Sequence, residues 1–262
     1  MTGTPTRTPP FGQLLREWRQ RRRLSQLDLA IDADVSARHV SFIETGRSVP
    51  SRSMVLRLAE VLQVPLRERN QLLAAAGLAP GYEERPLEDP GMTAIRHGVE
   101  HVLNAYNPFP CVAVDRRWQI VQSNAGATVL LDGVAAHLLE QPNALRIALH
   151  PDGLAPRIAN LAQWRHHVLT RLRRETAVTG SAHLGVLLSE LESYPGGLEE
   201  TRDLGGVAVP LELYTTGGQL LTFLGTVTTF GTALDLTAAE LSIEAFLPAD
   251  DATTRAMTGL TT

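Results

Sequence analysis

Between 11 and 77, apolar residues recur every three or four positions, which is the spacing of one face of an α-helix. Ser25 and Ser36 each precede such a stretch, and serine is a preferred residue at the start of a helix. Gly46 and Gly77 each follow one, as is typical of helix ends. The pattern predicts five short helices in this region, packed as a compact all-α bundle.

Beyond this bundle the pattern changes twice. Residues 78–91 are rich in proline, glycine and acidic residues, which predicts a linker. Residues 92–253 mix helical spacing with the alternation of strands, which predicts an α/β domain of the α+β type with strands near both ends. The segments 1–10, predicted to be disordered, and 254–262 are expected to be tails. The predicted strands are 111–115, 118–123, 206–215 and 218–230, the predicted helices are 92–106, 125–140, 156–175 and 182–192, and 237–246 fits either a helix or a strand.

Charge is distributed unevenly between the two regions. Residues 1–80 carry 12 arginines and 7 acids, a net charge of +5, whereas residues 81–262 carry 12 arginines and 21 acids, a net charge of −9. The sum is the −4 of the whole chain, so the overall value conceals the asymmetry. The distribution indicates that only the N-terminal region meets a polyanion.

Two compositional features exclude whole classes of protein. The chain has no lysine, so a Schiff-base lysine, a P-loop lysine and a Ser–Lys peptidase dyad are impossible. The single cysteine, Cys111, excludes an internal disulfide and fits a reducing cytoplasm.

No apolar run approaches the ~20 residues needed to cross a bilayer. The first residues lack the apolar segment of a secretory signal.

The order helix, tight turn, helix in "LSQLDLAIDADVSARHVSFIETGR" resembles the XRE-type (lambda-repressor-like) helix-turn-helix family. The resemblance spans about 11–77, and it departs from the commoner pattern at Asp32-Ala33-Asp34, where a small residue is usual. It implies that Glu44 forms a partly buried pair with Arg19 in a structural role. The residues that carry it are Leu24-Ser25-Gln26, Leu29-Ala30, Val35-Ser36, Val40-Ser41, Ile43-Glu44 and Gly46-Arg47.

The second helix of this motif has two distinct faces. At 100° per residue, Val40 and Ile43 fall together and are expected in the core. The opposite face lies in the DNA major groove in this family. There Arg38 is expected to read a guanine, and Phe42 to cover thymine methyl groups, instead of packing in the core. The predicted DNA-binding residues are Gln26, Ser36, Arg38, His39, Ser41, Phe42, Thr45 and Arg47.

Some of these residues also have plain structural interpretations. A lone arginine on a helix is usually a solvated charge, although Arg38 and Arg47 are interpreted as base and phosphate contacts respectively. His39 lies at the edge between core and groove, where packing or phosphate contact is favoured over base reading. Gln26 resembles the family glutamine that anchors a backbone phosphate. The Arg21-Arg22-Arg23 run fits either a backbone contact or a solvated surface equally well.

No catalytic motif is visible in the C-terminal region. His97 and His101 have the spacing of metal ligands on a helix, but no third ligand accompanies them and an exposed helix face is favoured. Cys111 opens an apolar strand and is interpreted as a small core residue. There is no GxSxG, glycine-rich phosphate loop or CxxC motif. The chain is therefore predicted to be no enzyme and to hold neither a metal nor a cofactor.

Three segments of this region resemble the MmyB-like ligand-binding domain of XRE regulators. They are "NPFPCVAVDRRWQIVQSNAGA" (107–127), "NALRIALHPDGLAPRIANLAQWRHHVLTRLRRE" (143–175) and "LLTFLGTVTTFGTALDLTAAELSIEAFLPADDAT" (220–253). The resemblance covers nearly all of 92–253 and implies a PAS-like α/β fold with a fatty-acid-like ligand.

The ligand pocket of such a domain should be apolar with a few directed polar groups. Arg157 or His150 would meet a carboxylate. The alternatives remain open, because Trp118 and Phe230 also fit a packed core and Arg157 also fits a pair with a protein acid. The candidate ligand-binding residues are Trp118, Asn124, His150, Arg157, Asn160, Trp164, Phe223 and Phe230.

The resemblances imply a cytoplasmic, sequence-specific transcription regulator that senses a small hydrophobic, fatty-acid-like ligand. A homodimer on a pseudo-palindromic double-stranded DNA operator is expected, because one such module makes a small interface of about 600–1,000 Å². Membrane partners are not expected. A self-cleaving repressor is excluded by the missing lysine. The remaining alternative is a DNA-binding regulator whose C-terminal domain serves protein–protein interaction or dimerisation without a small-molecule effector.

Overall fold

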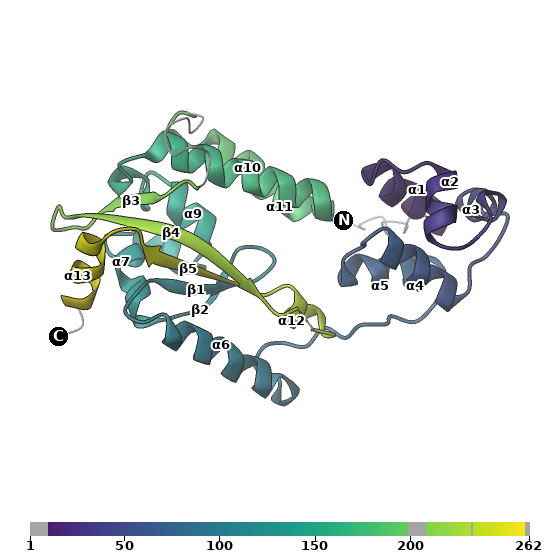
Figure 1. Ribbon diagram of the computed structural model, residues 1–262, viewed down its shortest axis with the longest axis horizontal. Coiled ribbons are helices and arrows are strands. Elements are labelled where there is room, and N and C mark those ends of the chain that lie inside the picture. The colour runs from purple at the N-terminus through teal and green to yellow at the C-terminus, as the bar shows by residue number, and fades with distance from the viewer. Residues whose placement is uncertain (1–9, 199–207, 232, 260–262) are drawn as a thin grey trace, which may run out of the picture. The chain divides into compact units, whose positions relative to one another are not determined.

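The computed structural model describes residues 10–198, 208–231 and 233–259, and the chain divides into two units (Figure 1). The first unit runs to Glu84 and includes Leu234–Leu236, and the second holds the remainder. Most of the predicted tail 1–10, the first two residues of the predicted strand 206–215 and the end of the predicted tail 254–262 lie outside the described residues. No helix in the described ranges is long and apolar enough to cross a membrane.

The first unit consists of the five helices that the apolar spacing predicts. Each of the two serines expected to begin a helix does so: the hydroxyl of Ser25 accepts from the backbone N–H of Asp28, and that of Ser36 accepts from His39. Gly46 adopts a φ of 73°, a left-handed conformation that glycine reaches without a Cβ clash. The helices are α1 Phe11–Arg21, α2 Gln26–Asp32, α3 Ala37–Glu44, α4 Arg52–Val61 and α5 Leu66–Ala75.

One apolar cluster holds these helices together. Its members are the residues that the helical spacing places on inward faces, so burial of apolar surface fixes the bundle. The cluster includes Phe11, Leu15, Trp18, Leu29, Val40, Ile43, Val55, Leu58, Leu62 and Leu72. The prediction of an all-α bundle is confirmed.

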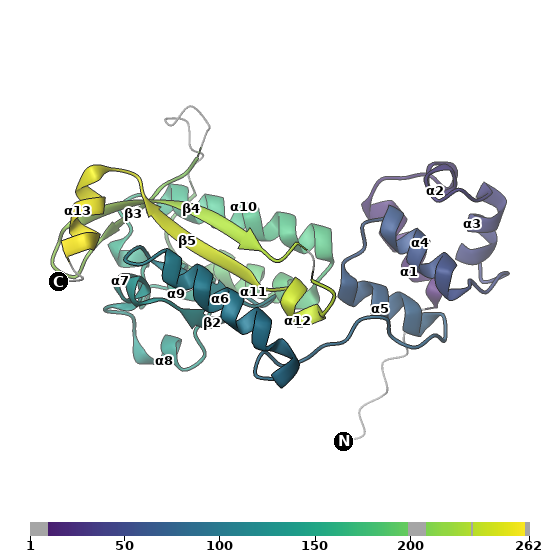
Figure 2. The ribbon, with the colours of Figure 1, turned by 60° about the horizontal axis from the view of Figure 1, so that its bottom comes forward.

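The second unit is built on a five-stranded antiparallel sheet in the order β2-β1-β5-β4-β3. Figure 2 shows the sheet bent along its length, with the long β4 and β5 strands crossing the unit. The strands are β1 Cys111–Val114, β2 Ile120–Ser123, β3 Leu211–Tyr214, β4 Leu220–Thr229 and β5 Ser242–Pro248.

Helices cover the two faces of this sheet unequally (Figures 1 and 2). Helix α6 (Thr93–Ala105) packs on one face through a small cluster that contains Cys111 and Ile243. Helices α10 (Leu161–Thr179) and α11 (Ala182–Ser193) belong to the larger cluster on the other face. The shorter helices are α7 Thr128–Leu131, α8 Ala136–Leu139, α9 Ala144–Leu149, α12 Leu236–Ala239 and α13 Asp251–Gly259, with 3₁₀ turns at Pro90–Met92, Ala125–Ala127 and Ala155–Arg157.

Strand alternation assigns each residue of β1 and β5 to one of these faces. In β1, Val112 and Val114 belong to the larger cluster, whereas Cys111 and Ala113 belong to the cluster under α6. Burial raises the pKa of the Cys111 thiol to about 11, and Glu244 adds to this shift. The thiol therefore stays protonated at neutral pH, which fits a small core residue.

The structure differs from the predicted elements in several places. The predicted helix 125–140 is divided into the 3₁₀ turn Ala125–Ala127 and the helices α7 and α8, and the predicted helix 156–175 begins only at Leu161. The segment 237–246 forms the helix α12 and then the strand β5. Helix α9 was not predicted and begins because Asn143 Oδ1 accepts from the N–H groups of Leu145 and Arg146. Helix α13 occupies much of the segment expected to be a tail. Its Met257 is 2% exposed and joins the larger cluster, so tertiary packing orders this segment.

Candidate functional site

Helix α3 presents one face to solvent. Val40 and Ile43 are buried in the bundle, as the 100° spacing predicts. Arg38 and Thr45 are exposed, and Ser41 and Phe42 are half-buried. With Arg47, which follows the helix, these four residues form what we call the α3 outer face: Arg38, Ser41, Phe42, Thr45 and Arg47.

Phe42 organises the charges on this surface. The guanidinium of Arg38 lies 5.1 Å from the centre of the Phe42 ring, and that of Arg47 lies 5.9 Å from it. Both distances suit a cation–π interaction. Phe42 is outside the apolar cluster of the bundle, so its contacts are with two arginines instead of core residues. Two positive groups are thereby placed within about 6 Å of the centre of one aromatic ring.

Behind this face, Glu44 joins three other residues. Its side chain is 0% exposed and accepts from Arg19 at 2.7 and 3.0 Å, which confirms the expected pair. Gln26 Nε2 donates to Glu44 at 2.8 Å, and Arg16 lies 3.6 Å away. Burial alone would raise the pKa of Glu44, but the hydrogen bonds from Arg19 and Gln26 and the nearby arginine charges outweigh it and lower the pKa overall. The group is a carboxylate that ties α1 and α2 to α3.

The remaining predicted DNA-binding residues have local roles in the structure. The Ser36 hydroxyl is occupied by the α3 N-cap, and the Thr45 hydroxyl donates to the carbonyl of Ser41 at 2.7 Å. The amide nitrogen of Gln26 is used by Glu44, which leaves its oxygen. His39 is half-buried at the edge of the helix. Only the two arginines of the α3 outer face present cationic groups there.

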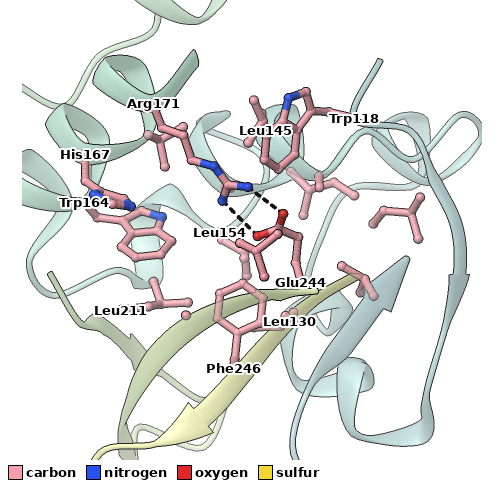
Figure 3. Close-up of a pocket in the computed structure, with 18 of the residues that line it drawn as sticks. Trp118, Leu130, Leu145, Leu154, Trp164, His167, Arg171, Leu211, Glu244 and Phe246 are labelled. Atoms are coloured by element: carbon pink, nitrogen blue, oxygen red, sulfur yellow. Dashed lines mark hydrogen bonds and ion pairs between the residues drawn. The ribbon is translucent and has the colours of Figure 1, made fainter. Parts of the chain in front are cut away.

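The second candidate site is a cavity of about 380 Å³ in the second unit, which we call the α10 cavity (Figure 3). Helices α9 and α10 and the strands β1, β2, β3, β4 and β5 all contribute to its wall. The size is within the range of small-molecule sites. The wall is largely apolar and includes Val112, Ile120, Leu130, Leu131, Leu145, Ile147, Leu154, Val168, Leu211 and Phe246.

An ion pair interrupts this apolar wall. Arg171 of α10 donates to both oxygens of Glu244 of β5, at 2.9 and 2.7 Å. Figure 3 shows the two side chains pointing toward each other, with Trp118 beside Arg171. The guanidinium carbon of Arg171 lies 4.6 Å from the centre of the Trp118 ring. Among the described lining residues, histidine aside, the two that carry a formal charge are thus bound to each other.

A second acid lies close to this pair. The indole N–H of Trp118 donates to Glu175 at 3.1 Å. Burial raises the pKa of Glu175, with a smaller contribution from Glu244, although Trp118 and Arg171 act in the opposite direction. Burial would lower the pKa of Arg171, but the hydrogen-bonded Glu244 and the charge of Glu175 raise it overall. Arg171 is therefore a cation associated with two acidic residues.

Trp118 and Trp164 are the predicted ligand-binding residues that line the α10 cavity. Trp164 is 8% exposed, and its indole nitrogen is buried without a hydrogen-bond partner among the described residues. Its ring lies beside His167 and Phe246, with centroid distances of 5.6 and 6.5 Å (Figure 3). Trp164 therefore contributes a buried donor whose hydrogen bond is not made by any of the described residues.

The other six candidates lie outside the lining. The guanidinium of Arg157 donates to the carbonyls of Asp132 and Tyr214, so it meets backbone oxygens where a carboxylate was expected. The side-chain amides of Asn124 and Asn160 also bind backbone groups. Asn124 Oδ1 accepts from the N–H of Cys111, and Asn160 Oδ1 accepts from the N–H of Glu212. Phe223 is a core residue, and Phe230 packs with the cluster under α6.

His150 lies in a separate surface group with His137 and Asp152. The possible ligand atoms of these three residues lie within 4.8 Å of one another. His150 Nδ1 already accepts from the backbone N–H of Asp152 at 3.0 Å. The ring also contacts Tyr194, with a centroid distance of 5.0 Å. One of the two His150 nitrogens is thus committed within the protein. By contrast, His97 and His101 are exposed on α6.

Sequence reasoning missed the residues that give the cavity its polarity, namely Arg171, Glu244 and His167. Glu244 sits in "SIEAF", where Ile243 and Ala245 face α6 and place the acid on the cavity side. An acid between apolar strand residues is a usable signal of a buried polar pair. An acid on an outward-facing position needs no partner, but a buried acid does. Its partner is 73 residues away and could not be paired from spacing.

Comparison with known proteins matches both units. Residues 95–260 match the MmyB-like transcription regulator ligand binding domain, and residues 10–72 match a helix-turn-helix domain. The chain is 36% identical over 103 residues to the uncharacterized HTH-type transcriptional regulator RghRB of Bacillus subtilis (strain 168), covering 36% of this chain and 72% of the relative. The restriction-modification controller protein C.AhdI from Aeromonas hydrophila is 37% identical, with a TM-score of 0.22, covering 22% of this chain and 89% of that chain.

Proposed function

Because the chain belongs to the MmyB-like transcription regulators, with an XRE-type helix-turn-helix and a ligand-binding domain, we propose that it binds an operator through the α3 outer face and responds to a ligand in the α10 cavity. The observation that carries the proposal is the cavity of about 380 Å³ in the domain that the family uses for ligands. Its described lining residues are apolar except for one ion pair and one histidine. Operator binding implies a place in the cytoplasm.

In the proposed complex, α3 enters the major groove of double-stranded DNA. Arg38 donates to a guanine edge, and Phe42 contacts thymine methyl groups. Arg47 binds a backbone phosphate, with Gln26, Ser36, His39, Ser41 and Thr45 completing the surface. The support is the cation–π arrangement, in which both arginines contact the Phe42 ring in the protein without DNA. Preorganised side chains lose less entropy on binding.

We further propose a homodimer on a pseudo-palindromic operator. A single module of this kind buries about 600–1,000 Å² against DNA, which is small for tight specific binding. Two modules related by a two-fold axis read two half-sites and add their contacts.

The proposed ligand is small and mostly apolar, with a fatty-acid-like hydrocarbon chain, and the second unit is a PAS-like sensor. The apolar wall of the α10 cavity and the single antiparallel sheet with its helical covering support this assignment. An interaction domain without an effector would be expected to fill such a space with side chains, because protein interiors pack closely. The cavity therefore favours the sensor over a domain that serves only protein contacts.

The linker is the proposed route of coupling. Asn70 of α5 holds its first half, accepting from the N–H of Gly81 at 2.8 Å and donating to the carbonyl of Tyr82 at 2.7 Å. Leu236, which precedes β5 by a few residues, donates its N–H to the carbonyl of Glu83 at 2.8 Å. The second half is bound within the other unit, where Arg96 donates to the carbonyl of Leu87. A ligand that shifts β5 can therefore act on the linker.

The test begins with selection of binding sites from random DNA duplexes by the purified full chain. Affinity for the selected site is then measured at fixed salt with and without a lauroyl compound. We expect binding more than about 10³-fold tighter than to random DNA. We expect the ligand to change this affinity by at least about fivefold, because a ligand acts only through unequal affinity for two states. Identical affinities with an occupied cavity would contradict the sensor.

A further inference from the structure

The polar groups of the α10 cavity restrict the chemistry of its ligand beyond the proposed function, on which this inference rests. Arg171 is the only arginine among the described residues that line the cavity. Its charge is already balanced by the two oxygens of Glu244, at 2.9 and 2.7 Å. Glu244 is 8% exposed, so it cannot rely on water to replace the arginine.

A carboxylate in this cavity would meet two unfavourable conditions. If Arg171 kept its pair with Glu244, the ligand carboxylate would bring a further negative charge to Arg171. The charge of Arg171 is already balanced by Glu244, and Glu175 lies nearby. If Arg171 turned to the carboxylate, Glu244 would be left as a buried, unpaired anion. Both outcomes cost binding free energy, because charges interact strongly in a poorly solvated site.

An uncharged acceptor meets neither condition. A guanidinium has five N–H donors, and Glu244 takes two of those of Arg171, one on each terminal nitrogen. The side chain of Arg171 remains 34% exposed, so donors are left for a carbonyl oxygen. The cavity thus offers the remaining donors of Arg171, while the one carboxylate among its described lining residues is occupied.

We propose that the ligand of the α10 cavity is a neutral molecule, an apolar chain that ends in an ester or amide carbonyl, and that Arg171 binds this carbonyl while it remains paired with Glu244. The Arg171–Glu244 pair is then a specificity device. It receives a hydrogen-bond acceptor and rejects a free carboxylate of the same chain length.

The test compares laurate, methyl laurate and lauramide as competitors of the dye N-phenyl-1-naphthylamine on the full chain at pH 8. We expect the ester and the amide to displace the dye at concentrations more than about tenfold below laurate, because like charges at close range are strongly unfavourable. A laurate affinity equal to or above that of the ester would overturn the inference.

Any apolar cavity disfavours an ion, so a variant must show that Glu244 sets the preference. Glu244→Gln keeps an oxygen for Arg171 but removes the negative charge. We expect its laurate affinity to rise about tenfold or more while the methyl laurate affinity stays within about threefold. Glu192→Gln is the matched control, because this acid pairs with Arg173 on the exposed surface, and its ratio should equal that of the wild type.

The outcomes separate this inference from the proposed function. Failure of the dye and of all three lauroyl compounds to bind would contradict the sensor itself. Binding of all three with an unchanged laurate-to-ester ratio in Glu244→Gln would overturn only the role of the ion pair. If the variant does not fold, as circular dichroism would show, the ratio in the wild type still decides the neutral-ligand inference.

Discussion

Arg19 donates to both carboxylate oxygens of Glu44, at 2.7 and 3.0 Å, across 25 residues of sequence. Arg16 approaches the same carboxylate at 3.6 Å, but its side chain is 57% exposed, whereas that of Arg19 is 11% exposed. One acid therefore has a buried and an exposed partner of the same type. The arrangement allows the buried, hydrogen-bonded partner and the exposed partner to be compared by one substitution at each arginine.

Arg19→Met should lower the free energy of unfolding by about 3–5 kcal/mol at pH 7, because it leaves the fully buried carboxylate of Glu44 without its main partner. Arg16→Met, the matched control, should cost less than about 1 kcal/mol, since exposed ion pairs contribute little. Denaturant unfolding of both variants checks the prediction. Equal losses would contradict the assignment of Glu44 to the interior.

The Glu44 pair should also make the bundle sensitive to acid. The pKa of Glu44 is lowered in the folded state from its ordinary value of 4.5, so its contribution is present above that value. It is lost as pH falls through the folded-state pKa, because the native carboxylate must then be protonated. The difference in stability between wild type and Arg19→Met should shrink over this range. A difference that stays constant down to pH 3 would argue against the linkage.

Phe42→Ala should weaken operator binding and leave stability nearly unchanged, because Phe42 contacts arginines outside the apolar cluster. The expected loss of stability is below about 1 kcal/mol. Its neighbour Ile43 is 1% exposed, and Ile43→Ala should cost about 2–5 kcal/mol. Thermal unfolding and operator titration of both variants separate the two faces of α3. A Phe42→Ala loss as large as that of Ile43→Ala would place Phe42 in the core.

Arg38 and Arg47 should differ in what they contribute to the proposed complex. Arg38→Gln should cost about 1–3 kcal/mol of binding and relax specificity at one base pair. Arg47→Gln should weaken binding to all sequences alike and reduce the salt slope by about one. Titrations at several salt concentrations, on the selected operator and on its single-base variants, distinguish these effects. The reverse pattern would exchange the two roles.

Glu175→Gln should stabilise the second unit at high pH. The pKa of Glu175 is raised in the folded state, mainly by burial, so its favourable contribution is present below the unfolded value and is lost as pH rises through the folded pKa. The glutamine keeps an oxygen for the indole N–H of Trp118 and carries no charge. The variant should therefore melt above the wild type at pH 8, with the difference decreasing toward pH 4. A lower melting temperature at pH 8 would show that the Glu175 charge is needed.

Residue spacing alone determined the N-terminal bundle, its caps and the two faces of α3. These features depend on contacts a few residues apart, where helix geometry dictates which side chains share a face. The same local logic found β1 and β2, whereas Trp118 and Trp164 of the cavity were named from the resemblance to the MmyB-like ligand-binding domain.

Only the tertiary structure decided which polar groups share the cavity. Arg171 and Glu244 meet because α10 covers the sheet in one particular register, and a slip of one residue in β5 would turn Glu244 to the α6 face. The local pattern does not predict such pairings. It shows which residues share one face of a helix or strand, but not which faces of distant elements meet. For the same reason Arg157 and Asn124, which look directed in sequence, turned out to bind the backbone.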